Sequence, residues 1–492
     1  MFHWIARFRF RNGCLRGKVD YHKRGCCLAV SSSRRILSVV RVDAMKKWGY
    51  IFCIMFFLFG LASCSGEQSK GSSSETIKIA QQFIELLQKG DMVGAANMFD
   101  ATMKTALPPD KLQEVWNQVK TQCGDLKSQN EMRVEKIGNS EVVYISCAFE
   151  KTALEAKVVF DSRQRISGLW FAPKQPNVEY KSPAYIKHEE FVERPVTVGD
   201  DKEWELPGTL TLPKGKGPFP ALVLVHGSGP QDRDETIGPN KPFKDLAWGL
   251  ASQGIAVLRY EKRTKYYTAR IVRMSERMTV KDETIDDALE AVKTLRKIPE
   301  IDQKRIFVLG HSLGGMLIPR IAKGNSDIAG VVILAGTTRP LEDVILDQTA
   351  YLFSLKNQPG ADQSPVEKIR AQVAKVKDKN LSSETPASEL PFSIPASYWL
   401  DLRDYKPAEA AKHLTQPMLI LQGGRDYQVT YLDYDGWKEA LVDKKNVTFK
   451  LYPKLNHLFV EGEGKSSPDE YDKPGNVAEI VVEDIAAWVK AQ

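Results

Sequence analysis

The feature that most constrains the fold of this chain is the segment Gly310-His311-Ser312-Leu313-Gly314. It lies between an apolar run at 306–309, which predicts a buried strand, and a pattern that predicts a helix. A serine at such a turn stands on a sharply bent backbone, and its neighbours Gly310 and Gly314 must be small because the bend brings them close to other backbone. The segment therefore predicts a strand-turn-helix unit with Ser312 as a candidate nucleophile.

The same rhythm of strand and helix continues on both sides of this segment. Short runs that are apolar throughout, such as 222–225, predict strands buried on both faces, as in a parallel sheet. We therefore expect an α/β domain with a mostly parallel sheet over 190–492. The alternation pauses at about 337–406, which predicts a helical cap insertion. The aromatic residues of this cap either line a pocket or form the cap's own core. Further strands are expected at 255–258, 305–309, 331–334 and 418–421, and helices at 243–252, 284–295 and 315–323.

A different pattern covers residues 76–173, where helices come first and strands follow. This order predicts a small α+β domain, and it resembles the nuclear-transport-factor-like cone fold. Such folds can hold a pocket, but no cluster of His, Asp and Arg indicates catalysis here, so we expect a spacer or a dimerisation module and a possible homodimer. The helices are expected from Thr76, over 93–103 and after Pro109, the strands at 142–149, 154–160 and 166–171, and a linker at 174–189.

The chain opens with a basic segment, residues 1–44, that has no apolar period and is expected to be disordered. It holds ten Lys or Arg and two Asp or Glu, so it accounts for the whole surplus in the net charge of +7 and leaves −1 for the rest. No basic patch with interleaved aromatic residues occurs elsewhere. A nucleic-acid partner is therefore not expected.

Residues 45–63 have the features of a secretion signal: two lysines, an uncharged apolar run at 48–60 and small residues before Cys64. The run is shorter than the roughly 20 residues of a membrane-spanning helix. The segment Leu61-Ala62-Ser63-Cys64 resembles the bacterial lipobox. The resemblance implies cleavage, lipidation of Cys64, a flexible tether over 64–75 and attachment to the cell-envelope membrane after export. A simple signal peptide or an uncleaved anchor stays open.

Two cysteines, Cys123 and Cys147, lie beyond the leader and Cys64. They could pair in an oxidising compartment, or they could be two buried thiols. No Cys and His cluster has the spacing of zinc ligands, so we expect no metal and no cofactor.

A serine nucleophile needs a base and an acid. His457 follows a strand at 447–451, and Asp426 follows the strand at 418–421, which is where such a sheet would present them. Asp426 would accept the Nδ1 proton of His457. Asp433 and Asp435 compete for the acid role, but they fall in the next expected helix, where acidic residues commonly face solvent.

The negative charge of a tetrahedral intermediate needs hydrogen-bond donors. One candidate is the backbone N–H of Leu313, directly after the serine. The second is the backbone N–H of Ser228, in the small-residue loop that follows the strand 221–225. His226 and Gly227 begin this loop, and we expect His226 to be structural.

The serine motif, the order Ser312, Asp426, His457 and the loop at His226 resemble the α/β-hydrolase family. Segments 226–235, 258–263 and 279–288 further resemble a bacterial carboxylesterase subgroup related to dienelactone hydrolases and serine aminopeptidases. The resemblance covers about 190–492 and implies the same three catalytic positions. Glu261 departs from the aspartate of that subgroup. Dienelactone hydrolases proper use a cysteine, so Ser312 argues against that particular activity.

These observations predict a membrane-tethered serine hydrolase that cleaves carboxylic esters, with a small-molecule ester as substrate, through an acyl-enzyme intermediate. Two alternatives stay open. The first is an aminopeptidase or amide hydrolase with the same triad, and the second is a non-catalytic binding lipoprotein.

Overall fold

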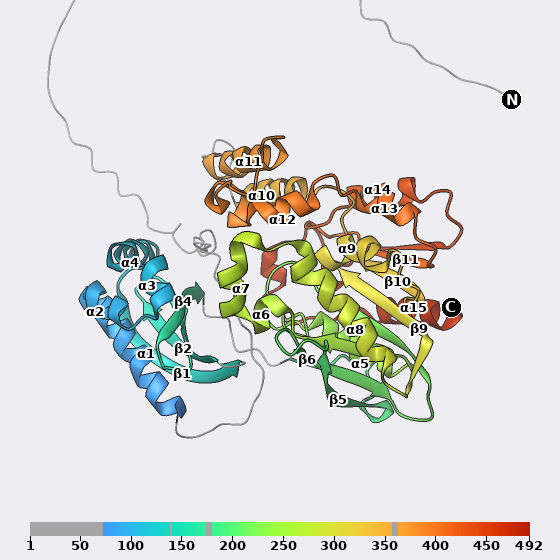
Figure 1. Cartoon of the computed structure of the whole chain (residues 1–492), viewed down its shortest axis with the longest axis horizontal. Helices are drawn as coiled ribbons and strands as arrows, with labels where there is room; N and C mark the ends of the chain where they lie inside the picture. Colours follow the sequence, from blue (N-terminus) through green and yellow to red (C-terminus); the bar gives the residue numbers. More distant parts are fainter. Residues whose placement is uncertain (1–71, 138–139, 174–179, 357–362) are drawn as a thin grey trace, which may run out of the picture. The chain divides into compact units, whose positions relative to one another are not determined.

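The structure is a computed structural model that describes residues 72–137, 140–173, 180–356 and 363–492 (Figure 1). The expected leader and signal, Cys64 and residues 65–71 of the expected tether lie outside these residues, and their assignments stay predictions. The flexible tether expected over 64–75 is wrong for its last four residues, because residues 72–75 form the first turn of a helix. Among the helices of the described ranges, none is long and apolar enough to span a bilayer.

Four helices open the described chain and pack on a small sheet (Figure 1). Ala80, Ile84 and Leu87 share the buried face of the first helix, as their spacing predicts. The prediction of a single helix over 93–103 is wrong. Two short helices replace it, because Asp100 caps a new helix by accepting a hydrogen bond from the Met103 N–H at 2.7 Å. The four helices are α1 (Ser72–Lys89), α2 (Met92–Asn97), α3 (Ala101–Ala106) and α4 (Pro109–Cys123).

The small sheet is an antiparallel meander in the order β1-β2-β3-β4. Its first strand lies at the edge of the sheet and consists mostly of polar residues. It lacks a clear alternation of apolar and polar residues, so it was not expected from the sequence. Cys123 and Cys147 are buried as free thiols, and burial raises the pKa of Cys147 to about 11. The helices followed by this sheet confirm the α+β class. The strands are β1 (Leu126–Ile137), β2 (Ser140–Phe149), β3 (Ala153–Phe160) and β4 (Ile166–Pro173).

The second sheet has eight strands in the order β12-β11-β10-β9-β7-β8-β6-β5. The six from β12 to β8 are parallel, and β6 and β5 are antiparallel additions at one edge. The expected parallel α/β sheet is therefore confirmed, whereas β5 and β6 were missed. The strands are β5 (Phe191–Val198), β6 (Leu206–Pro213), β7 (Phe219–Val225), β8 (Ala256–Tyr260), β9 (Ile301–His311), β10 (Gly330–Leu334), β11 (Met418–Gly423) and β12 (Val447–Tyr452).

The central strands are apolar throughout because helices cover both faces of this sheet. In β7, Leu222 and Leu224 face one helical layer, and Val223 and Val225 face the other. The first layer contains α5 (Pro242–Ala251) and α15 (Glu479–Ala491). The second contains α8 (Asp286–Arg296), α9 (Leu313–Ala322), α13 (Pro407–Lys412) and α14 (Tyr431–Ala440).

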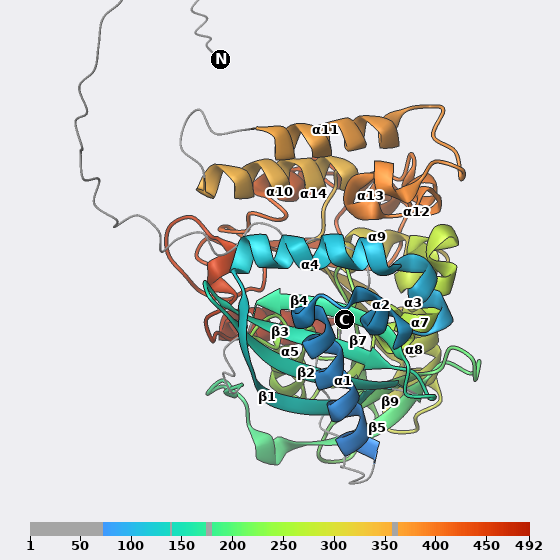
Figure 2. The same ribbon diagram turned by 90° about the vertical axis from the view of Figure 1, so that its left-hand side faces the viewer.

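A helical insertion separates β10 from β11. Its helices α10 (Leu341–Lys356), α11 (Ser364–Lys377) and α12 (Ala396–Leu402) lie together, and Figure 2 shows α10 and α11 side by side. Trp399 is buried in the insertion's own core, which was one of the two roles expected for the cap aromatics. Two short helices, α6 (Arg263–Tyr266) and α7 (Thr268–Met274), were not expected; they follow β8.

Candidate active site

Ser312 lies at the turn between β9 and α9, where the motif predicted it. Its φ of +54° and ψ of −115° place it in a conformation that non-glycine residues rarely adopt. The turn is held because the Ser312 N–H donates to the Leu334 carbonyl at 2.9 Å, at the end of β10. The strained backbone therefore presents the hydroxyl at the carboxyl edge of the sheet.

The two glycines of the motif are required by close backbone contacts. A Cβ at Gly310 would lie 2.3 Å from the Gly314 carbonyl oxygen, and a Cβ at Gly314 would lie 2.4 Å from the Val225 carbonyl oxygen. Any side chain at either position would force backbone apart. The expectation that these neighbours must be small therefore has a direct geometric reason.

The structure brings His457 and Asp426 together. His457 Nδ1 lies 2.7 Å from Asp426 Oδ2, and both side chains are buried. The His457 ring also lies 4.7 Å, centroid to centroid, from the ring of His311, the residue before the serine. The predicted base thus lies against the turn that carries the predicted nucleophile.

The Asp426 carboxylate is held on both oxygens. Oδ1 accepts the backbone N–H groups of Gln428 and Val429 at 2.8 and 3.0 Å, and Oδ2 accepts from the Gln422 side chain at 3.3 Å as well as from His457. Gln422 was not recognised in the sequence because a single polar residue at a strand end has no distinctive pattern. These donors orient the carboxylate toward the imidazole.

Asp433, the competing acid, has a different role. The expectation that it faces solvent is wrong, because its side chain is fully buried. It accepts hydrogen bonds from the Thr337 hydroxyl at 2.6 Å and from the Arg339 guanidinium at 2.9 Å. Asp433 therefore ties α14 to the segment that leads into the insertion.

The two predicted oxyanion donors lie on different elements. Leu313 is the first residue of α9, where backbone N–H groups have no partner within the helix. In the loop after β7, the Gly227 N–H is already engaged by Glu235 Oε1 at 2.7 Å. Ser228 is exposed, and its N–H stays the candidate from this loop.

His226 is buried between the rings of Phe243 and Tyr260. Burial lowers the pKa of His226 to about 4, so the imidazole is neutral at pH 7. Its Nε2 lies 3.0 Å from the Asp232 carbonyl oxygen, to which the neutral ring can donate. These contacts favour the structural role expected for His226, which stays a prediction.

Comparison with known proteins shows the family to which this chain belongs. A family model described as serine aminopeptidase, S33, matches residues 221–463. A curated relative, Esterase EstD of Thermotoga maritima, is 43% identical over 409 residues, which span 83% of this chain and 93% of that protein. This chain belongs to the serine aminopeptidase S33 family of α/β hydrolases. The family resemblance of the sequence is thereby confirmed.

Other matches concern the N-terminal domain and solved structures of the hydrolase fold. A model described as a protein of unknown function, DUF3887, matches residues 80–169. The resemblance of this domain to the nuclear-transport-factor-like cone fold and its role as a spacer or dimerisation module stay predictions. An esterase from Pyrococcus furiosus aligns with a TM-score of 0.40 at 17% identity, over 65% of this chain and 98% of that chain. Est1E from Butyrivibrio proteoclasticus aligns with a TM-score of 0.38 at 16% identity, over 61% and 99%.

The hydrolase also contains a buried acid and base pair that sequence reasoning missed. His311 Nδ1 lies 2.9 Å from Glu235 Oε2, and His311 Nε2 lies 3.0 Å from the His457 carbonyl oxygen. Because Glu235 also holds the Gly227 N–H, this pair joins three segments: the serine turn, the loop that carries His457, and the loop at 226–230 after β7. The last of these contains Ser228, the predicted second oxyanion donor, and is called the oxyanion loop below. The segment 226–235 was noted for its family resemblance, but nothing in it indicated a partner 76 positions away.

A Glu235→Gln variant should lose most stability near pH 5.5. Burial by itself would lower the pKa of His311, but the Glu235 carboxylate has the larger effect, and the pKa of His311 is raised. Burial by itself would raise the pKa of Glu235, but the His311 cation has the larger effect, and the pKa of Glu235 is lowered. The charged pair is therefore fully formed between about pH 4.5 and 6.5, and its contribution is lost as pH rises through the pKa of His311. We expect a loss of about 3–5 kcal/mol in urea unfolding at pH 5.5 and a clearly smaller loss at pH 9.

Glu300→Gln provides the matched control for this measurement. Glu300 pairs with Arg194, and both side chains are 39% exposed, so its loss should have a small effect at both pH values. Equal losses at pH 5.5 and 9 for Glu235→Gln would contradict a charged Glu235 and His311 pair.

A second buried ion pair holds the opposite side of the oxyanion loop. Lys262 Nζ donates to the Gly227 carbonyl at 2.6 Å and lies 2.5 Å from Glu283 Oε1. Glu283 also accepts from the Tyr398 hydroxyl of α12 at 2.7 Å. Sequence reasoning placed Lys262 and Glu283 in family-like segments without a role, because ion pairing across elements has no signal in the spacing.

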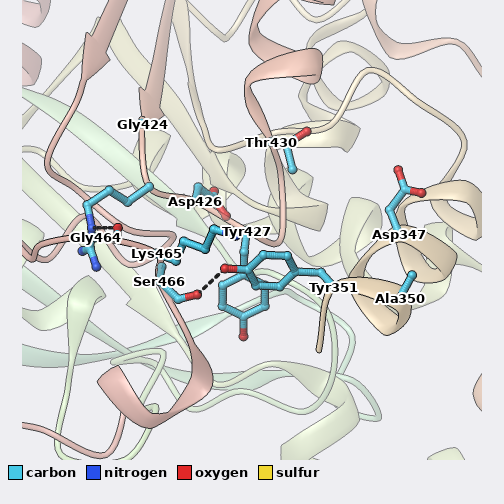
Figure 3. A pocket seen from close by; sticks show the side chains of 11 residues that line it. Asp347, Ala350, Tyr351, Gly424, Asp426, Tyr427, Thr430, Gly464, Lys465 and Ser466 are labelled. Carbon is cyan, nitrogen blue, oxygen red and sulfur yellow. Dashed lines mark hydrogen bonds between the residues drawn. The ribbon is translucent and has the colours of Figure 1, made fainter. Parts of the chain in front are cut away.

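A cavity of about 450 Å³ lies beside the turn that carries Asp426 (Figure 3). The Tyr351 ring from α10 stacks on Tyr427 at 5.2 Å, and its hydroxyl donates to the Ser466 carbonyl at 2.7 Å. Ser312 and His457 do not line this cavity. The cavity therefore lies beside Asp426 and helix α10 of the insertion, and not beside Ser312. Among the described residues, no group of three His, Cys, Asp or Glu could hold a metal ion.

Proposed function

We propose that this hydrolase, an esterase by its relationship to EstD, cleaves carboxylic esters through an acyl-enzyme on Ser312. The observation that carries the proposal is the 2.7 Å hydrogen bond between His457 and Asp426, with the imidazole beside the strained turn of Ser312. An isolated serine is a weak nucleophile at neutral pH, and this pairing supplies the oriented base that it needs.

The first half of the reaction forms the acyl-enzyme. His457 Nε2 takes the Ser312 hydroxyl proton as Oγ bonds to the ester carbonyl carbon, and the carbonyl oxygen becomes an oxyanion that accepts from the N–H groups of Leu313 and Ser228. The tetrahedral intermediate then collapses. The bond between carbon and the alcohol oxygen breaks, and the alcohol leaves with the proton held by His457.

The second half releases the acid. A water molecule gives a proton to His457 and attacks the acyl carbon, and the second intermediate expels Ser312 Oγ, which recovers the proton. Throughout, Asp426 accepts the Nδ1 proton of His457 and holds the tautomer whose Nε2 can accept. The carboxylate also stabilises the imidazolium that forms in each step.

The proposal is tested by hydrolysis of p-nitrophenyl acetate, butyrate and octanoate, followed by mass spectrometry of the protein quenched during turnover. We expect turnover and a mass increase equal to the acyl group on the peptide that contains Ser312. Turnover with the acyl group on another residue would overturn the assignment of the nucleophile. The dependence of kcat/KM on chain length would also define the acyl pocket.

Amide cleavage is the second candidate, since the matching family model is described as serine aminopeptidase. An aminopeptidase needs an acidic group for the substrate amine, and Asp347 lines the cavity beside Asp426. Asp347 is already paired with Arg339, which argues against this use. Higher kcat/KM for aminoacyl p-nitroanilides than for p-nitrophenyl esters would favour the aminopeptidase.

A further inference from the structure

The oxyanion loop has a feature that the triad does not explain, and the following inference rests on the proposed function. Its Gly227 carbonyl oxygen is bound by a buried ammonium group, Lys262 Nζ, at 2.6 Å. The Lys262 and Glu283 side chains are only 2% and 6% exposed. A buried cation has a large desolvation cost, and its placement on a backbone carbonyl beside the nucleophile therefore calls for a reason.

The geometry of the peptide bond provides that reason. The Gly227 carbonyl and the Ser228 N–H belong to one planar trans peptide group, so they point in opposite directions. A group that fixes the carbonyl also fixes the direction of the N–H. Gly227 packs against the nucleophile, since a Cβ there would lie 3.2 Å from Ser312 Cβ. The constrained peptide is therefore the one adjacent to the reacting serine.

The neighbouring peptide group is held as well. The Gly227 N–H donates to Glu235 at 2.7 Å, so the two peptide groups that flank the Gly227 Cα are each bound by a buried charged side chain. Glycine has more backbone freedom than any other residue, and two such bonds remove that freedom. Preorganised donors of this kind need no rearrangement when negative charge develops.

The charge of Lys262 has a second effect. A cation at the carbonyl oxygen withdraws electron density from the peptide group, and hydrogen bonds in a chain polarise one another in a low-dielectric interior. The N–H on the opposite edge becomes a stronger donor. A neutral donor at the same place would orient the peptide but polarise it less.

We propose that Lys262, held by Glu283, is a positioning residue that orients and polarises the Gly227–Ser228 peptide toward the oxyanion. Glu283 accepts from the Tyr398 hydroxyl of α12, so the same network extends into the helical insertion. Lys262 acts through the backbone and does not touch the substrate.

The test removes both charges together, because a single change would leave the other charge buried and unpaired. In Lys262→Met/Glu283→Gln, methionine keeps much of the side-chain length and glutamine keeps an acceptor for Tyr398. The matched control is Arg263→Met/Asp287→Asn. Arg263 directly follows Lys262, and Asp287 lies four positions after Glu283. Both control side chains are buried, and Arg263 Nε lies 2.9 Å from Asp287 Oδ2.

For p-nitrophenyl butyrate we expect kcat of the Lys262 and Glu283 variant to fall about 10- to 100-fold with little change in KM, because the oxyanion forms only after binding. The inhibition constant of a trifluoromethyl ketone, which binds serine hydrolases as a tetrahedral oxyanion, should rise by the same factor. The control pair should leave both quantities within about threefold of the original protein. Circular dichroism and urea unfolding would confirm that both variants are folded.

The proposal is overturned if the folded variant keeps its kcat, if kcat falls without a matching rise in the inhibition constant, or if the control pair shows the same losses. These outcomes differ from a failure of the proposed function. In that case the original protein would itself show no acyl group on Ser312 during turnover.

Discussion

Replacement of Ser312 by alanine should lower kcat for p-nitrophenyl butyrate by about four to six orders of magnitude while the protein stays folded. Alanine has no atom that can bond to the carbonyl carbon, so the acyl-enzyme cannot form. The measurement is kcat by absorbance at high enzyme concentration, together with labelling by a fluorophosphonate probe, which should disappear. Any residual rate would come from water activated by His457 in the intact site.

The fold of Ser312→Ala is expected to persist because the turn is held by backbone groups. The N–H of residue 312 still donates to the Leu334 carbonyl, and alanine adds no new contact. Ser252→Ala is the control, since this serine lies at the end of α5 and donates to the Trp248 carbonyl. Retained turnover in folded Ser312→Ala would remove the serine from the mechanism.

Asp426→Asn should lower kcat by about three to four orders of magnitude. The carboxylate accepts the Nδ1 proton of His457 at 2.7 Å, whereas an amide can present its NH₂ group to that nitrogen and stabilise the wrong tautomer. The Nε2 atom would then carry the proton and could not accept one from Ser312. The measurement is kcat and KM for the same ester, with KM expected to change little.

Asp433→Asn separates the catalytic acid from the structural one. This change weakens the bond to Arg339 and should lower the free energy of unfolding by about 1–3 kcal/mol, with kcat of the folded protein within a few fold. A larger loss of kcat for Asp433→Asn than for Asp426→Asn would exchange their roles. Both variants replace an aspartate by asparagine, so a difference in kcat between them depends on where the aspartate lies in the structure.

The sequence was most informative where local physics is strict. The apolar runs at 222–225 and 331–334 indicated strands buried on both faces, and both are central strands of the parallel sheet. The serine turn was recognisable because two glycines and a helix start must occur at fixed offsets, and the contacts of Gly310 and Gly314 show why. Predictions failed where propensity is weak, as in the polar edge strand β1.

Residues 312, 426 and 457 could be nominated from the sequence because each follows its own strand or turn, and the strand ends meet at one edge of the sheet. The choice between Asp426 and Asp433 could only be argued, since both lie near the right place in the chain. Tertiary structure placed Asp426 against His457 and buried Asp433 against Arg339.

The pairs that hold the oxyanion loop belong wholly to the tertiary structure. Glu235 meets His311, and Lys262 meets Glu283, across strands and helices whose packing sets the distances. The spacing of apolar residues and glycines along the chain is a local property of the sequence. It was therefore enough to predict the central strands, the serine turn and the type of nucleophile. An ion pair depends on burial and on the folding of distant segments into contact, so only the folded chain decided which charges support the site.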